Sequence, residues 1–517
     1  MPARTTAAAV LLLTLIAGIA PASAQAPAAE QKAPEQKPAD AATAAAKGEA
    51  WEGEIDAMGQ ILGFVVHVTR DENGSATSAT LDIPMQGVSG VALRDLVMDG
   101  ESFKFTFAFP GAPAAMFDLK LDAIDKGRAV GTMSQGMATL PTTARKLEPG
   151  QAPKGPSRPQ NPVPPFEYAS IEVTFPGGAE GVEMAGTLTF PAQGGPHPAV
   201  VLVSGSGPQD RDETLLGHKP FLVLSDALTK AGIAVLRYDD RGVGLSTGDF
   251  GAGTTDDFAR DAANAVAFLR TRKEVDPKRI GIIGHSEGGL IAPIIANECG
   301  AAFLVLLAGP GTDGKTVLGD QMRAIATANG RPEDNVNQQV KVQQEMLTKV
   351  MENAPPEEIA PLMKRLIAVQ SGKPEAEGEE LEKVAPGAMV DQAVKGLLSP
   401  WMRRFLQIDP VPHLEKVTVP VLALIGLNDT QVIASINLPK IEAALEKAGN
   451  KDVTCLGIKG VNHLFQTSAS GSPAEYATIS ETISPAVLKK VTQWVRQRTG
   501  LEEIPKATTP APRNDGD

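Results

Sequence analysis

Cysteine is almost absent from this chain of 517 residues, which contains only Cys299 and Cys455. A chain of this length can bury a sizeable core and does not need a disulfide for stability. Cys299 lies at the end of a predicted helix, and Cys455 lies in a predicted apolar strand. We therefore expect two buried thiols rather than a disulfide bond.

An excess of positive charge is also missing. The chain has 48 Lys and Arg residues against 61 Asp and Glu residues, so its net charge is -13. Such acidity disfavours binding to nucleic acid or to an anionic membrane surface, and we expect no nucleic-acid partner. Metal-binding patterns such as His-Glu-x-x-His do not occur either, and we expect neither a metal nor another cofactor.

The N-terminal apolar run is too short to span a bilayer comfortably, because it extends only from Ala7 to Ala20. It follows the basic residue Arg4 and precedes Ala22-Ser23-Ala24, an order typical of a secretory signal peptide. We expect residues 1–24 to be removed and the protein to be exported, to the periplasm or beyond, without an integral membrane segment. The alternative is that this segment is not cleaved and anchors the protein in the membrane. No cysteine follows for lipid attachment, and no twin-arginine pair is present.

Two predicted domains follow a linker at residues 25–47, which is rich in Ala, Pro, Gln and Lys and is expected to be disordered. Residues 48–148 show short runs in which apolar residues alternate with polar ones. This pattern predicts about eight half-buried antiparallel strands in a small barrel or sandwich. The clearest run is a stripe of phenylalanines, Phe103, Phe105, Phe107 and Phe109. Core packing explains this stripe better than a ligand cavity does. The proline-rich segment 149–165 is expected to be a semi-rigid spacer.

The second predicted domain, residues 166–500, contains uniformly apolar strands that alternate with amphipathic helices. This pattern indicates an α/β fold with a mostly parallel sheet covered on both faces. The alternation stops at about residues 312–418, where polar helical stretches predict an inserted helical cap, and the strand at 419–425 resumes the sheet. Residues 501–517 are expected to be a disordered tail.

The most informative motif is Gly284-His285-Ser286-Glu287-Gly288, which lies between an apolar strand and an apolar helix. This G-x-S-x-G pattern in a strand–turn–helix context is a nucleophile elbow. The glycines permit a tight turn that exposes the serine hydroxyl at the start of a helix, where backbone N–H groups can hold an oxyanion. We expect Ser286 to be the nucleophile. Ser246 also fits G-x-S-x-G, but it is flanked by loop on both sides.

A serine nucleophile needs a base and an acid that orients the base. In this topology the acid precedes the histidine, and both follow the serine. His463 alone among six histidines occupies a loop that leaves the last predicted strand, so we expect it to be the base. Asp429 directly follows the preceding strand and is the expected acid. Asp391 and Asp409 lie in or beside the cap, where no strand would direct them.

The expected oxyanion hole consists of two backbone N–H groups. One is that of Glu287, the residue after the nucleophile, and the other comes from the loop at 204–212. We choose Ser206 for the second, with Gly207 as the neighbouring possibility. The charged residues around these loops are expected to form bracing ion pairs; they are Asp210, Arg211, Asp239 and Arg241.

Residues 166–500 resemble a capped α/β-hydrolase of the bacterial esterase and serine-aminopeptidase-like group. The resemblance rests on the motifs Gly205-Ser206-Gly207-Pro208, Asp240-Arg241-Gly242-Val243-Gly244-Leu245-Ser246, the elbow, Asp429 and Asn462-His463. The resemblance implies that Ser286 is the nucleophile, Asp429 the acid and His463 the base, and that residues 205–208 form the oxyanion loop. The chain departs from its relatives at Ser204, where they often carry histidine. The first domain lies outside the resemblance.

The resemblance implies a small ester or acyl substrate, with peptidase activity as the runner-up and non-catalytic ligand binding as a remote alternative. Six methionines in the cap suggest a pliable apolar mouth, although core packing explains many of them equally well; they are Met322, Met346, Met351, Met363, Met389 and Met402. Residues 309–316 match the phosphate-loop pattern G-x-x-x-x-G-K-T, but Asp313 would place a carboxylate beside the phosphates. The sequence leaves the oligomeric state open.

Overall fold

The computed structural model describes residues 48–57, 60–71, 73–83, 88–107, 114–135, 138–148, 151 and 158–502. The predicted signal peptide and first linker therefore lie outside the described residues, as does the tail after residue 502. No helix within these ranges is long and apolar enough to cross a membrane.

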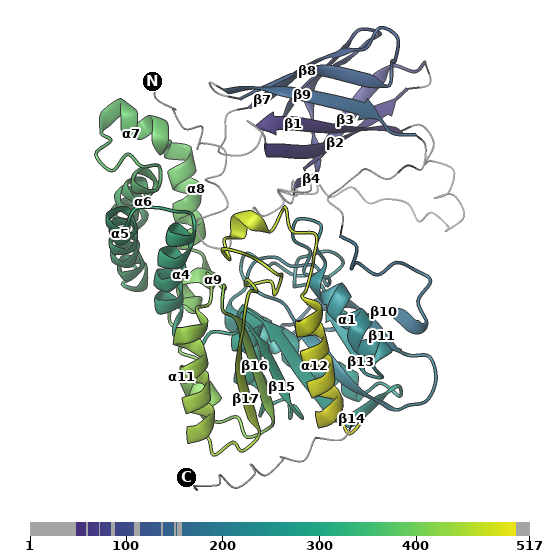
Figure 1. The fold of residues 1–517 in the computed structure, drawn as a ribbon, viewed down its shortest axis with the longest axis vertical. Helices are drawn as coiled ribbons and strands as arrows, with labels where there is room; N and C mark the ends of the chain where they lie inside the picture. Colours follow the sequence, from purple (N-terminus) through teal and green to yellow (C-terminus); the bar gives the residue numbers. More distant parts are fainter. Residues whose placement is uncertain are drawn as a thin grey trace, which may run out of the picture.

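The N-terminal domain is one antiparallel sheet (Figure 1). In the part of the chain that is described it has nine strands, one more than expected, in the order β4-β3-β2-β1-β9-β8-β7-β6-β5. Because β3 and β5 also contact each other, the sheet curls towards a barrel. The strands are β1 Gly48–Ala57, β2 Gln60–Arg70, β3 Ala76–Ile83, β4 Val88–Ala92, β5 Arg94–Met98, β6 Ser102–Phe107, β7 Ala115–Leu121, β8 Arg128–Gln135 and β9 Ala138–Lys146.

The phenylalanine stripe fills the interior of this curled sheet. In β6 every second side chain is buried, and the ring of Phe105 stacks on that of Phe117 with centroids 4.4 Å apart. Trp51 packs against Phe103 at the same core. Buried aromatic rings of this size contribute much of a small domain's hydrophobic stabilisation. Phe109 lies outside the described residues.

The second domain contains an eight-stranded sheet within the described chain, in the order β10-β11-β13-β12-β14-β15-β16-β17. The first two pairings are antiparallel and the remaining five are parallel. The central strands are almost fully buried, which explains their continuous apolar sequences. The strands are β10 Tyr168–Pro176, β11 Glu183–Pro191, β12 His197–Val203, β13 Ala234–Tyr238, β14 Val275–His285, β15 Leu304–Leu307, β16 Val421–Gly426 and β17 Val453–Ile458.

Helices cover both faces of this sheet (Figure 1). One core lies between the sheet and α2, α3 and α11, and the other lies between the sheet and α1 and α12. A capping box formed by Thr254 and Asp257 starts α2. The helices are α1 Pro220–Lys230, α2 Thr255–Arg270, α3 Glu287–Ile295, α11 Ala434–Lys447 and α12 Pro485–Arg498.

The expected helical cap is inserted between β15 and β16, and Figure 1 shows its upper helices beside the sheet domain. It has a core of its own, which Leu290 of α3 joins from below. Three of the six cap methionines are buried in that core and two more pack against it, so packing accounts for these five; Met351 is exposed. The helices are α4 Gly314–Ala328, α5 Glu333–Met351, α6 Pro356–Gln370, α7 Gly378–Val384, α8 Gly387–Leu397, α9 Pro400–Phe405 and α10 Val411–Leu414.

The end of the proline-rich segment is attached to the catalytic domain. Arg158 donates hydrogen bonds to the carbonyl oxygens of Leu216 and Ile479, the latter at 2.6 Å. The side-chain amide of Gln160 donates to the carbonyl oxygen of Ile483 at 2.7 Å and accepts from the N–H of Ile483 at 3.0 Å. From Arg158 onward the segment is therefore part of the domain surface rather than a free spacer.

The two cysteines are both free thiols. Cys299 is buried, as expected, whereas Cys455 is only partly buried. The expectation that both thiols are buried is therefore wrong for Cys455. Burial raises the pKa of both, that of Cys455 to about 12. Thiols with raised pKa values are poor nucleophiles, and both have a packing role.

Candidate active site

Ser286 occupies a sharp turn between the end of β14 and the start of α3. Its φ angle is 52°, in the left-handed region that side chains other than glycine rarely adopt. A Cβ atom on Gly284 would lie 2.0 Å from the carbonyl oxygen of Gly288, and one on Gly288 would lie 2.1 Å from that of Val203. Both positions therefore require glycine, and the turn presents the Ser286 hydroxyl at the first turn of α3.

The structure brings the three predicted side chains into one hydrogen-bonded chain. Ser286 Oγ lies 3.1 Å from Nε2 of His463, and Nδ1 of His463 lies 2.9 Å from Oδ2 of Asp429. Because Asp429 follows β16 and His463 follows β17, both loops leave the carboxyl edge of the parallel sheet, as the elbow does. This arrangement can draw a proton from the serine hydroxyl and hold the imidazole in the tautomer that does so.

The predicted acid, Asp429, is held in place by hydrogen bonds and away from water. The Asp429 side chain is fully buried, and its Oδ1 accepts hydrogen bonds from the backbone N–H groups of Gln431 and Val432 at 2.7 and 2.9 Å. Its other carboxylate oxygen, Oδ2, contacts Nδ1 of His463. The base loop is held similarly, because Oδ1 of Asn462 accepts from the N–H groups of Leu464 and Gln466.

The loop after β12 lies against the nucleophile. A Cβ atom on Gly205 would be 3.3 Å from Cβ of Ser286. Ser204 Oγ donates to Asp240 at 2.8 Å, and the N–H of Gly205 donates to the Glu213 carboxylate at 2.8 Å. Ser206 is the next residue of this loop. That the N–H groups of Ser206 and Glu287 hold the oxyanion stays a prediction.

The expected ion pairs brace these loops. Arg211 contacts Asp239 through Nη2 at 2.7 Å, and Arg241 contacts Asp261 through Nε at 2.7 Å. Asp210 instead accepts from the backbone N–H groups of Asp212 and Thr214, both at 3.0 Å. The charged side chains therefore organise the loops around the site.

Sequence reasoning missed the side chain of Glu287, whose backbone N–H it had assigned. The carboxyl group is buried and accepts hydrogen bonds from Thr255 at 2.6 Å and from the indole of Trp401 in the cap at 2.8 Å. Burial raises its pKa above the usual value. No local pattern links α2, the elbow and α9 before the chain folds, so the sequence carried no signal for this contact.

The second G-x-S-x-G motif, at Ser246, and the phosphate-loop pattern at residues 309–316 both have structural roles. Ser246 is buried, with its Oγ donating to the carbonyl of Asp239 at 2.7 Å and accepting from the N–H of Ala185 at 2.8 Å. In the segment 309–316, Asp313 caps α4 by accepting from the N–H of Thr316, and Lys315 donates to Thr348. The second G-x-S-x-G is thus a loop brace, and the phosphate-loop pattern begins a cap helix.

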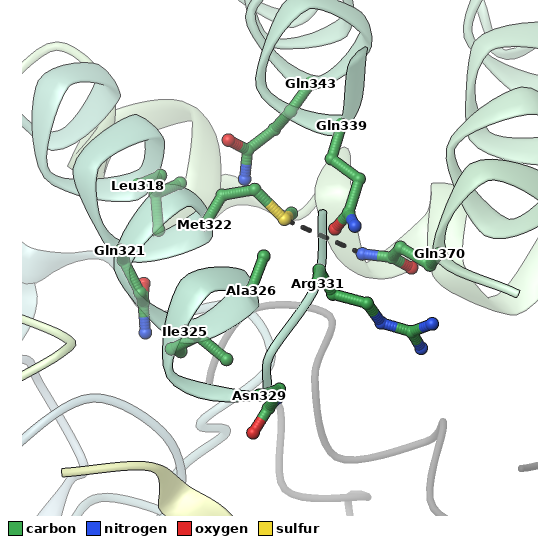
Figure 2. A pocket seen from close by; sticks show the side chains of 10 residues that line it. All are labelled: Leu318, Gln321, Met322, Ile325, Ala326, Asn329, Arg331, Gln339, Gln343 and Gln370. Carbon is green, nitrogen blue, oxygen red and sulfur yellow. Dashed lines mark hydrogen bonds between the residues drawn. The ribbon is translucent and has the colours of Figure 1, made fainter. Parts of the chain in front are cut away.

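A cavity of about 60 Å³ lies inside the cap, lined by residues of α4, α5 and α6 (Figure 2). Figure 2 shows the amides of Gln339, Gln343 and Gln370 gathered around Met322, whose sulfur accepts from Gln370 Nε2 at 3.7 Å. None of Ser286, His463 and Asp429 lines it. The described residues also contain no cluster of three His, Cys, Asp or Glu side chains that could hold a metal ion.

Comparisons with known proteins show what this chain is similar to. The family profile described as "Serine aminopeptidase, S33" matches residues 220–373. Esterase EstD of Thermotoga maritima is 26% identical over 334 residues, which cover 64% of this chain and 69% of that protein. An uncharacterised protein of Mycobacterium tuberculosis is 32% identical over 127 residues, covering 25% of this chain and 41% of its own. The solved structure of a Pyrococcus furiosus esterase covers 65% of this chain and 92% of its own, with 17% identity and a TM-score of 0.38.

The sheet order, the insertion after β15 and the elbow between β14 and α3 define the class: the protein has the α/β-hydrolase fold with an inserted helical cap. Within that class it is a serine hydrolase, and it carries an additional N-terminal β domain that lies outside the residues matched by the family profile. The expected fold class is confirmed.

Proposed function

We propose that this protein is an exported serine esterase that cleaves small carboxylic esters through an acyl-enzyme intermediate. The observation that carries the proposal is the continuous contact from Ser286 Oγ through the His463 ring to the buried Asp429 carboxylate. A similar protein named an esterase supports ester hydrolysis, and the N-terminal charge and apolar pattern support export.

In the proposed reaction, Nε2 of His463 takes the proton of Ser286 while Oγ bonds to the ester carbonyl carbon. The carbonyl oxygen becomes an oxyanion held by the N–H groups of Ser206 and Glu287, each worth about 3 kcal/mol in the transition state. The C–O bond to the alcohol then breaks, and His463 returns the proton to the leaving oxygen. Water, activated by the same imidazole, hydrolyses the acyl-enzyme.

The test is to compare turnover of short and long p-nitrophenyl esters with that of aminoacyl-nitroanilides. We expect ester turnover that Ser286→Ala abolishes in a protein whose thermal unfolding is unchanged. Ser246→Ala is a matched control, because its hydroxyl lies outside the triad. Ester turnover that persists in Ser286→Ala would contradict the proposal.

Peptide hydrolysis is the second candidate, because the matched family profile is described as a serine aminopeptidase. The same three side chains could cleave an amide, but an aminopeptidase also needs a group that anchors a substrate's N-terminal amine. Preferential turnover of aminoacyl-nitroanilides over every ester tested would favour this candidate. Fractionation of the producing cell, with N-terminal sequencing of the mature protein, tests export and the cleavage after Ala24.

A further inference from the structure

A second acid–histidine pair lies directly beneath the nucleophile. Nδ1 of His285 lies 2.8 Å from Oε1 of Glu213, and both side chains are more than nine-tenths buried. His285 immediately precedes Ser286, and its ring centroid is 5.0 Å from that of His463. The ring of His285 therefore lies beside the predicted base.

The hydrogen-bond partners of this pair determine where its protons lie. Nε2 of His285 is 3.1 Å from the backbone carbonyl oxygen of His463, which can only accept, so Nε2 carries a hydrogen. Oε1 of Glu213 already accepts from the N–H of Gly205. The contact between Nδ1 and Oε1 therefore needs a further proton, and an imidazolium donating to a carboxylate satisfies every partner.

Charges around the pair are consistent with that state. Burial lowers the pKa of His285, but the Glu213 carboxylate, the backbone carbonyl of His463 and Asp429 together raise it above its usual value. Burial raises the pKa of the nearby buried carboxyls of Asp240 and Glu287, which favours their neutral forms. The negative charges that offset the burial of a cation at His285 are therefore those of Glu213 and Asp429.

The pair connects three segments that the proposed reaction must hold together. Glu213 binds the loop after β12 through Gly205, His285 is part of the elbow, and His285 also binds the base loop through the carbonyl of His463. Glu213 reaches this position with a φ angle of 54°, in the region that favours glycine. A residue kept in a disfavoured backbone conformation is typical of functional sites.

We propose that Glu213 and His285 form a buried imidazolium–carboxylate pair that positions the oxyanion loop and the base loop around Ser286. This inference rests on the proposed function, because it assigns the pair to the esterase reaction. Neither residue reaches the reacting atoms through the contacts described, so both are positioning residues. Their removal lowers the rate of the chemical step rather than the affinity for the ester.

Kinetics of Glu213→Gln test the proposal, because glutamine keeps the shape but cannot supply the anion. We expect kcat to fall about 10- to 100-fold with KM changed less than about two-fold, as for loss of one oxyanion contact. Binding of a trifluoromethyl ketone, which mimics the oxyanion, should weaken by the same factor. The exposed Glu298→Gln is the matched control, and it should behave as wild type.

Wild-type kcat in Glu213→Gln, or a change confined to KM, would overturn the positioning role. A second measurement needs no variant: nitrogen-15 NMR of histidine-labelled wild-type protein at about pH 7.5 should show both ring nitrogens of His285 protonated. A neutral His285 ring would overturn the ion pair, even if Glu213→Gln fails to fold. If Ser286→Ala leaves ester turnover intact, the proposed function fails instead, and the NMR result still stands.

Discussion

The indole N–H of Trp401 donates to both carboxylate oxygens of Glu287, at 2.8 and 3.0 Å. Trp401 belongs to the cap helix α9, and Glu287 is the first residue after the nucleophile. The same cap helix is attached a second time, because Arg404 contacts Asp256 at the start of α2 at 2.5 Å. The position of the cap is thus coupled to the backbone that we assign to the oxyanion hole.

Replacing Trp401 with phenylalanine should lower kcat/KM for a small ester about ten-fold. The substitution keeps a ring against Phe405 but leaves the buried Glu287 carboxyl with one donor fewer, which costs about 1–3 kcal/mol. Steady-state kinetics check this. Trp494→Phe is the control: Nε1 of Trp494 has no hydrogen-bond partner among the described residues, so that change should leave turnover intact. Equal kinetics in both variants would contradict the coupling.

Asp429→Asn should lower kcat about 10⁴-fold while the protein stays folded. The remaining oxygen of the amide can still accept from the N–H groups of Gln431 and Val432, so the loop keeps its shape. The amide nitrogen, however, would face His463 Nδ1 as a donor and favour the wrong tautomer. Turnover and thermal unfolding measured on the same sample check this. A loss below ten-fold would exclude Asp429 as the acid.

His218 should make the catalytic domain sensitive to acid. Its buried ring lies 3.1 Å from the carbonyl oxygen of Tyr476 and 2.9 Å from the Thr482 hydroxyl, and burial lowers its pKa to about 4. Between pH 6.5 and pH 4 the unfolded chain takes up a proton that the native chain does not. The contribution to stability is complete above pH 6.5 and is lost as the pH falls through this window.

At about pH 5 the loss from His218 should be about 2 kcal/mol relative to pH 7.5. Urea unfolding followed by tryptophan fluorescence at both pH values measures it. His218→Gln should reduce the difference, whereas His67→Gln, at a half-exposed side chain of the β domain, should not. An undiminished difference in His218→Gln would assign the acid sensitivity to other groups.

Removal of residues 25–150 should leave turnover of small esters within about two-fold of the full chain. The two sheets have separate hydrophobic cores, and the attachment of Arg158 and Gln160 to the catalytic domain is retained. Comparison of kcat and KM for p-nitrophenyl acetate checks the expectation. A large rise in KM for small esters would show that the β domain contributes to the substrate site.

The sequence was sufficient to predict the turn at Ser286 and the meeting of Ser286, Asp429 and His463, because their signals are local. Gly284 and Gly288 must be glycine at a turn of this tightness, and Asp429 and His463 each follow a strand that apolar residues identify. Strand order then brings these positions to one edge of the sheet. The same logic separated Ser246 from Ser286.

Contacts between loops that are far apart in the chain could not be predicted in this way. Glu213 approaches His285 across 72 residues, and Trp401 approaches Glu287 across 114. Neither pair has a spacing that a periodic element would impose, and a buried carboxyl is not distinguishable from an exposed one in sequence. The extra strand of the β domain was missed for a related reason, because short strands in alternating sequence have poorly defined ends.

The attachment of Arg158 also limits how far the two domains can separate. Arg158 comes only ten residues after Glu148 at the end of the β domain, and a chain of ten residues can span about 35 Å at most. Whatever the β domain binds would therefore be kept within about that distance of the anchored surface.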